Sequence, residues 1–192
     1  MRLAPLLLVA GWVATAVASS AAIDAEAVCA QLLNQYPKHV AWDVLGPNAI
    51  ETVFNARKYI EANTEYWNGV NRKNRPTCAF FPSNAEQVSV AVKLLNKYSD
   101  AQFALKSGGH NFNFGVSSTD GGVLFSFNQN LASVTRSEDG EAFHVGPGAR
   151  WEDVYEEASK TNQVVVGGRL GNIGVAGFAL GGGLSYYSAQ YV

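Results

Sequence analysis

The sequence is short of cysteine and of charge, and these shortages argue against several classes of protein. It has two cysteines, Cys29 and Cys78, with no histidine spaced to join them, so we do not expect a zinc or other metal site. Charged residues make up 16% of the chain, the net charge is −2, and the 14 Lys and Arg residues do not cluster. Because nucleic-acid-binding domains carry a basic patch or stripe, we expect no nucleic acid partner.

Long hydrophobic runs are also missing, except at the N-terminus. Arg2 precedes an apolar stretch, Leu3 to Val17, that is shorter than the roughly 20 residues of a membrane span. Ala16-Val17-Ala18 has the small-x-small pattern of a signal-peptide cleavage site. We therefore expect residues 1–18 to be a signal peptide, the mature chain to begin near Ser19, and the protein to be secreted and extracellular rather than membrane-bound. No Asn-x-Ser/Thr acceptor for N-glycosylation occurs.

The compartment has a consequence for the two cysteines. An exported protein meets an oxidising environment, in which cysteines pair. We therefore predict a disulfide between Cys29 and Cys78, whose closed loop should stabilise the fold by about 2–4 kcal/mol.

The first part of the chain is predicted to be one helix and an irregular cover. Apolar residues at helical spacing predict a helix over residues 24–34. Residues 36–74 are rich in Asn and aromatic residues without a clean period, so we interpret them as an irregular segment that covers the core.

From residue 78 onward the pattern indicates an α+β protein. A short strand over 78–81 is followed by a helix that Ser83 caps, with Glu86 completing a capping box. A half-buried strand over 102–106 follows, and the short connections predict a parallel, right-handed βαβ unit. A second lobe begins near Ser107. Its predicted elements are a strand over 123–127, a hairpin at Asp139-Gly140, an amphipathic helix over 151–158 and a buried strand over 164–166.

A glycine pair follows the predicted strand 102–106, in the segment Lys106-Ser107-Gly108-Gly109-His110-Asn111. Paired glycines permit a tight turn whose backbone N–H groups point into one concavity, which is how a loop holds a phosphate. Taken alone, the segment fits an ordinary strand-ending turn with a solvated histidine equally well.

A second glycine-rich stretch runs from residue 167 to residue 183. Glycines recur at positions 168, 171, 174 and 177. A helix would not keep so many, since each costs about 1 kcal/mol relative to alanine. Apolar residues between them distinguish the stretch from a flexible linker, so we predict a rigid, buried path lined by backbone, against something flat or anionic. Close packing of bare backbone without a ligand is the alternative.

A nicotinamide-type Rossmann site is disfavoured. It requires G-x-G-x-x-G with an acidic residue about 20 positions later. Residues 146–148 supply only the first half of that motif, and no acidic residue follows the glycines at 181–183.

Three segments together resemble the berberine-bridge-enzyme-like FAD-linked oxidases of the vanillyl-alcohol-oxidase superfamily. They are residues 106–111, Val-Gly-Pro-Gly-Ala-Arg-Trp at 145–151, and the glycines of 168–183. The resemblance implies an α+β fold, a PCMH-type FAD-binding domain of two α/β subdomains over residues 76–192, incomplete at its C-terminal end. Residues 19–75 would precede this domain as the N-terminal helix and irregular segment.

The resemblance also implies a flavoprotein oxidoreductase that uses FAD. The implied reaction transfers a hydride from a small-molecule substrate, not identified by the sequence, to the flavin, which O₂ then reoxidises. No residue of this chain stands out as a catalytic base. The implied covalent attachment point to the flavin is His110. The implied cofactor-binding residues are Ser107, Gly108, Gly109, His110, Asn111, Gly168, Gly171, Asn172, Gly174 and Gly177.

Three departures from the family pattern matter. Lys106 replaces the usual arginine, a change that keeps the positive charge. Leu170 stands where members with doubly attached flavin carry a cysteine, so attachment through His110 alone is implied. Family members also continue for several hundred residues beyond the position of Val192. A second hypothesis is therefore a non-catalytic, secreted remnant of a truncated oxidase gene or gene model. The remaining histidines, His39 and His144, are predicted to have no functional role.

Overall fold

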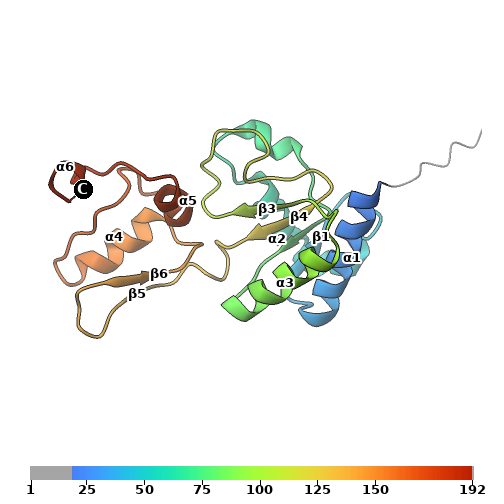
Figure 1. The fold of residues 1–192 in the computed structure, drawn as a ribbon, viewed down its shortest axis with the longest axis horizontal. Helices are drawn as coiled ribbons and strands as arrows, with labels where there is room; N and C mark the ends of the chain where they lie inside the picture. The colour runs from blue at the N-terminus through green and yellow to red at the C-terminus, as the bar shows by residue number, and fades with distance from the viewer. Residues whose placement is uncertain (1–18, 192) are drawn as a thin grey trace, which may run out of the picture.

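The computed structural model describes residues 19–191, so the predicted signal peptide lies outside the described residues. The chain forms two lobes that lie one after the other along its longest axis (Figure 1). The first lobe holds a four-stranded sheet with helices on it, and the second holds a two-stranded sheet and three helices. This is the predicted α+β arrangement of two subdomains.

The sheet of the first lobe is mostly parallel. Its strand order is β1-β2-β4-β3, with β1 antiparallel to β2 and the other pairs parallel. The strands are β1 (Val40–Trp42), β2 (Cys78–Phe80), β3 (Phe103–Lys106) and β4 (Val123–Ser126). The predicted βαβ unit is therefore present as β2, helix α3 and β3, but β4 lies between its two strands.

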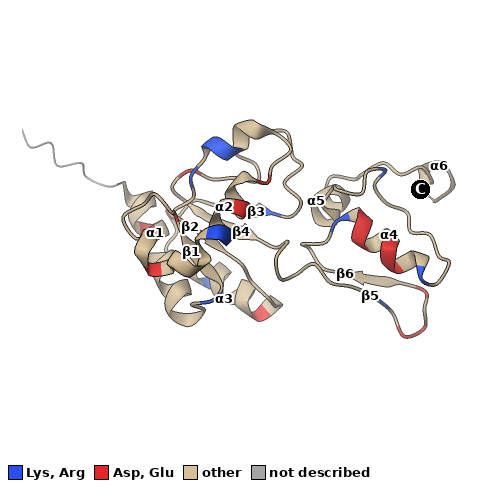
Figure 2. Cartoon of the chain, turned by 180° about the vertical axis from the view of Figure 1, so that it is seen from behind, with Lys and Arg blue, Asp and Glu red and all other residues tan. Residues whose placement is uncertain are grey.

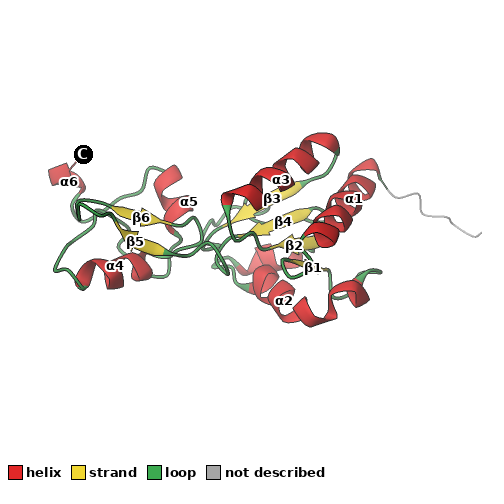
Figure 3. Cartoon of the chain, turned by 90° about the horizontal axis from the view of Figure 1, so that it is seen from below, coloured by secondary structure: helices red, strands yellow, loops and turns green. Residues whose placement is uncertain are grey.

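Helices cover both faces of this sheet. Helices α1 (Ser20–Gln35) and α3 (Ala85–Lys97) lie on one face and α2 (Ala56–Thr64) on the other (Figure 3). Alternate strand residues therefore enter two apolar clusters. Phe80 packs with residues of α1 and α3, whereas Phe81 packs with residues of α2.

The disulfide joins α1 to the sheet. Cys29 and Cys78 are bonded with their Cα atoms 6.0 Å apart, and both residues are fully buried. The prediction of this pair is confirmed.

The prediction that residues 36–74 are irregular is wrong. The segment contains β1, α2 and the 3₁₀ helices η1 (Ala49–Asn55) and η2 (Gly69–Lys73). Its helices are short and no side chain caps η1 or α2, so the usual sequence signals of a helix start are missing. The segment therefore supplies one strand of the sheet and the helix that covers one of its faces.

The cap of α3 also differs from the prediction. The side chain of Asn84, not of Ser83, accepts a hydrogen bond from the backbone N–H of Gln87, at 2.9 Å. Ser83 instead bonds to the side-chain oxygen of Gln87. The helix therefore starts at Ala85, and Glu86 stands in its first turn without completing a capping box with Ser83.

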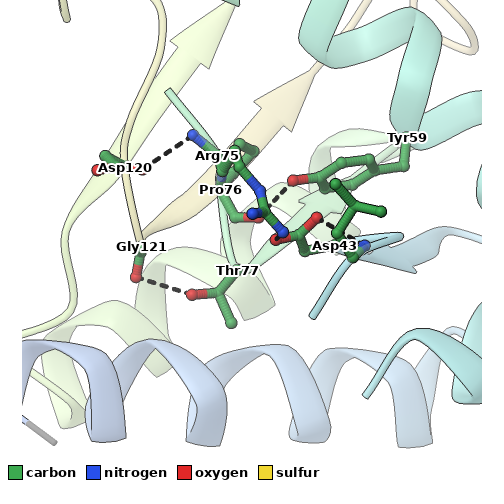
Figure 4. Close-up of polar contacts among 8 residues, drawn as sticks. Asp43, Tyr59, Arg75, Pro76, Thr77, Asp120 and Gly121 are labelled. Carbon is green, nitrogen blue, oxygen red and sulfur yellow. Dashed lines mark hydrogen bonds and ion pairs between the residues drawn. The ribbon is translucent and has the colours of Figure 1, made fainter. Parts of the chain in front are cut away.

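Polar contacts tie together the ends of three strands (Figure 4). Arg75 forms an ion pair with Asp43, which follows β1, and its backbone N–H donates to Asp120, which precedes β4. The hydroxyl group of Thr77 donates to the carbonyl oxygen of Gly121 at 2.8 Å. These contacts fix the start of β2 against its two neighbours in the sheet.

The second lobe contains the predicted hairpin and helix. Strands β5 (Val134–Arg136) and β6 (Phe143–Val145) pair antiparallel, and α4 (Trp151–Ser159) follows. The acidic residues of this lobe lie on this helix and on the hairpin turn (Figure 2). Two short helices complete the lobe, α5 (Val175–Leu180) and α6 (Ser188–Tyr191).

Three predictions for this lobe are wrong. The strand predicted over residues 123–127 is β4, which belongs to the sheet of the first lobe, so the second lobe begins after β4 and not near Ser107. Residues 164–166 form no strand, and Val164 is 69% exposed. In the described part of the chain, the second sheet consists of β5 and β6 alone, and residues 164–166 pair with neither strand. Residues 175–180 are helical despite Gly177, with the ring of Phe178 set against Trp151 at 5.2 Å. In residues 19–191, no helix combines the length and the apolar composition of a bilayer-crossing segment.

Candidate functional site

A cleft of about 470 Å³ lies where the two lobes meet. From the first lobe it is lined by the loop after β3 and by Phe127 after β4. From the second lobe it is lined by Pro147 and by residues around α5, which lies at the boundary between the lobes in Figure 1. Pro147 belongs to the 145–151 segment, so all three segments that carry the family resemblance reach this cleft.

The loop after β3 has the geometry of an anion-binding turn. Gly109 has φ +67°, and a Cβ there would lie 2.6 Å from the carbonyl oxygen of Glu65, so only glycine fits. Within the described part of the chain, none of the backbone N–H groups of Ser107–His110 donates to another backbone group. Their donors are therefore available to a ligand in the cleft.

Two buried hydroxyl groups beside this loop also have no partner. The Oγ atoms of Ser107 and Ser117 form no hydrogen bond with any described residue, and both residues line the cleft. Buried polar groups are nearly always satisfied, so a ligand is the natural source of the missing partners. Sequence reasoning missed Ser117. The signal was the run of small hydroxyl residues at 117–119, all of which are buried.

Gly108 and Gly174 bring the two glycine-rich segments into direct contact. A Cβ on either one would collide with backbone atoms of the other. The backbones therefore pack closely at these two positions, and the backbone of Gly168 packs against the indole of Trp151. The contact at Gly108 and Gly174 forms the junction of the two lobes at the cleft.

The imidazole of His110 lines the cleft and is set between aromatic and cationic groups. It stacks on the indole of Trp67 with ring centroids 6.0 Å apart and an interplanar angle of 28°. Partial burial lowers its pKa, and the positive charge of Arg150 lowers the pKa further. The ring is therefore neutral at neutral pH, with a nitrogen lone pair free to act as a nucleophile.

The other two histidines do not line this cleft. His144 is exposed on β6. His39 has a structural partner that the sequence did not indicate, since its Nδ1 lies 2.8 Å from the carbonyl oxygen of Phe81.

Residues 66–74 hold the cleft loop in place, which sequence reasoning missed. Asn71 is fully buried, and its Oδ1 accepts hydrogen bonds from the backbone N–H of Gly115 and the hydroxyl group of Ser118, both at 3.0 Å. The hydroxyl group of Tyr66 donates to the carbonyl oxygen of Ser117 at 2.9 Å. The density of asparagines in this segment was the available signal, because asparagine satisfies backbone groups of irregular loops.

Lys106 does not simply keep the charge of the arginine that it replaces. Its side chain is 1% exposed, its Nζ donates to the carbonyl oxygen of Ala62, and it lies 4.2 Å from the ring centroid of Tyr66. Burial lowers the pKa of this amine to about 7. The residue supports the loop from beneath rather than presenting a fixed positive charge.

The structure brings together part of the predicted cofactor set. The residues of that set that line the cleft are Ser107, Gly108, Gly109, His110, Asn111, Gly174 and Gly177. Three others lie outside it. Gly168 is buried against Trp151, Gly171 lies beside Glu152, and Asn172 is exposed with its carbonyl oxygen bonded to Arg150. Contact of these three with a cofactor stays a prediction.

Another hollow, of about 460 Å³, lies at the Arg75 cluster, on the first lobe. None of the predicted site residues lines it. Of the ionic and hydroxyl groups that line it, Asp43, Arg75, Thr77 and Asp120 are already bonded to each other or to backbone. The cleft between the lobes is therefore the better candidate.

Comparisons with known proteins identify the family of the chain. The model of a family described as FAD binding domain matches residues 76–192. An uncharacterized FAD-linked oxidoreductase of Arthroderma benhamiae is 42% identical over 137 residues, which cover 71% of this chain and 27% of that protein. The FAD-dependent monooxygenase prx3 of Penicillium roqueforti is 40% identical over 117 residues, or 60% of this chain and 22% of that protein. The chain thus spans about a quarter of the length of the curated relatives that it matches.

Solved structures show the same fold. BBE-like 1 of Physcomitrella patens matches with a TM-score of 0.68 and 21% identity, over 85% of this chain and 32% of that one. The 6-hydroxy-D-nicotine oxidase of Arthrobacter nicotinovorans matches with a TM-score of 0.65 and 23% identity, over 80% of this chain and 31% of that one. The chain therefore belongs to the FAD binding domain family, as expected, and it shares the fold of BBE-like 1.

Proposed function

We propose that the chain is the FAD-binding portion of an FAD-dependent oxidoreductase and that the cleft between the lobes holds the cofactor. The observation that carries this proposal is the gathering of unpaired donors at the cleft. The free backbone N–H groups of Ser107–His110 and the unpaired hydroxyl groups of Ser107 and Ser117 all lie at one loop. Donors arranged in this way suit the pyrophosphate of FAD, which carries negative charge and many acceptor oxygens.

On the other side of the cleft, helix α5 presents backbone without a side chain at Gly177. A Cβ on Gly177 would meet nothing within 4 Å, so nothing in the described chain requires glycine there. Glycine inside a helix costs about 1 kcal/mol relative to alanine. A flat ring lying close to the backbone of α5 would account for it, and the isoalloxazine ring of FAD is such a group.

His110 is the residue proposed to bond to the flavin. Attachment would join a ring nitrogen of His110 to the 8α-carbon of the flavin, with loss of the imidazole proton and one methyl proton, and the electron pair would remain on the flavin. O₂ would then take up these two electrons and two protons and be reduced to hydrogen peroxide. The neutral state of the His110 ring favours the attack, because a protonated ring has no free lone pair.

The cysteines of this chain do not compete for the flavin. Both are in the buried disulfide, and Leu170 has no thiol. A structurally similar glucooligosaccharide oxidase of Acremonium strictum, with a TM-score of 0.51, is described as carrying 6-S-cysteinyl, 8α-N1-histidyl FAD. We propose that this chain has the histidyl bond alone.

The activity proposed for the whole protein is oxidation of a small molecule. The bound flavin would accept a hydride from a substrate carbon and return the electrons to O₂. The residues of this chain would bind and orient the cofactor. We further propose that the protein is secreted, on the basis of the signal-peptide pattern of residues 1–18 and the buried disulfide.

The His110→Ala variant tests the attachment. The full-length protein, expressed with FAD available, is precipitated with acid and inspected for flavin fluorescence in a denaturing gel. Wild-type protein should keep its flavin, the Leu170→Ala control should keep it as well, and His110→Ala should release it while still binding FAD reversibly.

Two results would contradict the proposal at different points. If denatured wild-type protein loses all flavin, the role of His110 is wrong although the FAD site stands. If folded wild-type protein binds no FAD at all, the assignment of the cleft is wrong.

A further inference from the structure

We propose that Trp67 is a positioning residue that holds the imidazole of His110 in the orientation needed for attachment to the flavin. The inference rests on the proposed function, since it concerns the covalent bond between His110 and FAD. It assigns a role to a segment, residues 66–74, that the family motifs do not include.

The indole and the imidazole form a stacked pair. Their centroids are 6.0 Å apart with an interplanar angle of 28°. The side chain of Trp67 is 66% exposed, so it contributes little to the core of the lobe. An exposed tryptophan whose aromatic partner is the proposed nucleophile is better explained by that partner than by packing.

The backbone on both sides of His110 is fastened by the same short segment. The backbone N–H of Trp67 donates to the carbonyl oxygen of Gly109 at 3.1 Å, and the side-chain amide of Asn68 donates to the carbonyl oxygen of Phe112 at 2.6 Å. The loop is therefore tied to residues 67 and 68 on both sides of His110.

The ring of His110 still has a torsion that these bonds do not fix. The terminal torsion of a histidine side chain has a broad energy profile, so the ring plane needs a partner to define it. Within the described residues, the imidazole of His110 forms no hydrogen bond that would fix its plane. Besides the indole, the charged group that acts on the imidazole is Arg150. His110 lines the cleft and Trp67 does not, so the indole contacts the ring from outside the cleft. Stacking on the ring face does not engage the nitrogen lone pair, because that lone pair lies in the plane of the ring.

The test separates attachment from binding. Full-length apo-protein is prepared from riboflavin-limited expression, FAD is added at saturating concentration, and the growth of gel-stable flavin fluorescence gives the attachment rate. Reversible FAD affinity is measured for each substitution in the His110→Ala background, where no covalent bond can form. The variants are Trp67→Ala, Trp67→Phe and, as a matched control from the same segment, the exposed Val70→Ala.

Loss of the stack should slow attachment without weakening binding. An aromatic pair of this kind corresponds to a factor of roughly three to ten in rate. We expect Trp67→Ala to lower the attachment rate by that factor, Trp67→Phe to restore most of it, and Val70→Ala to leave it unchanged. The reversible affinity for FAD and the melting temperature of the apo-protein should be the same for all four proteins.

Three results would overturn the inference. An unchanged attachment rate in Trp67→Ala refutes positioning and leaves the proposed function intact. A slower rate with an equal loss of FAD affinity or of melting temperature shows that Trp67 is structural. Absence of covalent flavin in the wild-type protein would refute both the bond to His110 and the role of Trp67. FAD binding in the His110→Ala background would still show whether the cleft holds FAD.

Discussion

Replacing Lys106 with methionine should remove a pH dependence from the stability of the protein. Methionine keeps most of the length of the side chain and removes its amine. In the native structure this amine is buried and donates to the carbonyl oxygen of Ala62. Burial lowers its pKa from 10.5 to about 7, with a smaller upward effect of Glu65 and a smaller downward effect of Arg150.

The direction and size of the effect follow from these two pKa values. Between pH about 7 and 10.5 the unfolded chain keeps the proton of this lysine and the folded chain has lost it. The free energy of unfolding therefore rises with pH in this window, with a slope of up to about 1.4 kcal/mol per pH unit. From about pH 6 to about pH 9 the wild-type protein should gain on the order of 3 kcal/mol relative to Lys106→Met.

Urea unfolding of the apo-protein, followed by tryptophan fluorescence at a series of pH values, measures this difference. The exposed Lys97→Met variant is the control, and its curve should run parallel to that of the wild-type protein. Parallel curves for wild type and Lys106→Met across the same range would show that the amine of Lys106 is not held in the low-pKa state that its burial predicts.

Two further predictions concern the framework of the first lobe. The Cys29→Ser, Cys78→Ser double variant opens a loop with a sequence separation of 49, and its free energy of unfolding should fall by about 4 kcal/mol. A urea midpoint unchanged from that of the oxidised wild type would contradict this. Asn71→Ala leaves the buried hydroxyl group of Ser118 and the part-buried backbone N–H of Gly115 without their acceptor, so it should cost about 1–3 kcal/mol and speed amide exchange in residues 111–119. The exposed Asn96→Ala is its control, and equal exchange in the two variants would refute the role of Asn71.

Features set by local pattern could be predicted from the sequence. The glycine pair before His110 marks a turn that only glycine can make, and the cleft loop is found there. The alternation of strands and helix after Cys78 indicated the parallel sheet. The disulfide was predicted from the expected secretion of the protein and from its having two cysteines.

Features set by distant contacts could not. Asn71 acts on groups that lie 44 and 47 positions away, and no local signal states which loop it supports. The valines at 164–166 were predicted to form a strand that the structure does not contain. An apolar run indicates a preference for burial, but a buried strand also needs neighbouring strands, which the local pattern does not reveal. In α5, packing of Phe178 against Trp151 outweighs the helix penalty of a single glycine.

The contact between Gly108 and Gly174 sets the width of the cleft at the junction of the two lobes. At that point the main chains of the two lobes are in direct contact, with only the small hydroxyl group of Ser107 beside them. The spacing of the cleft walls there is therefore independent of the side chains that vary in size elsewhere in the lobes. A chain of quite different sequence could present a slot of the same width if these two positions stayed glycine. Any larger residue at either one would wedge the lobes apart, and enlarging its counterpart would only widen the gap.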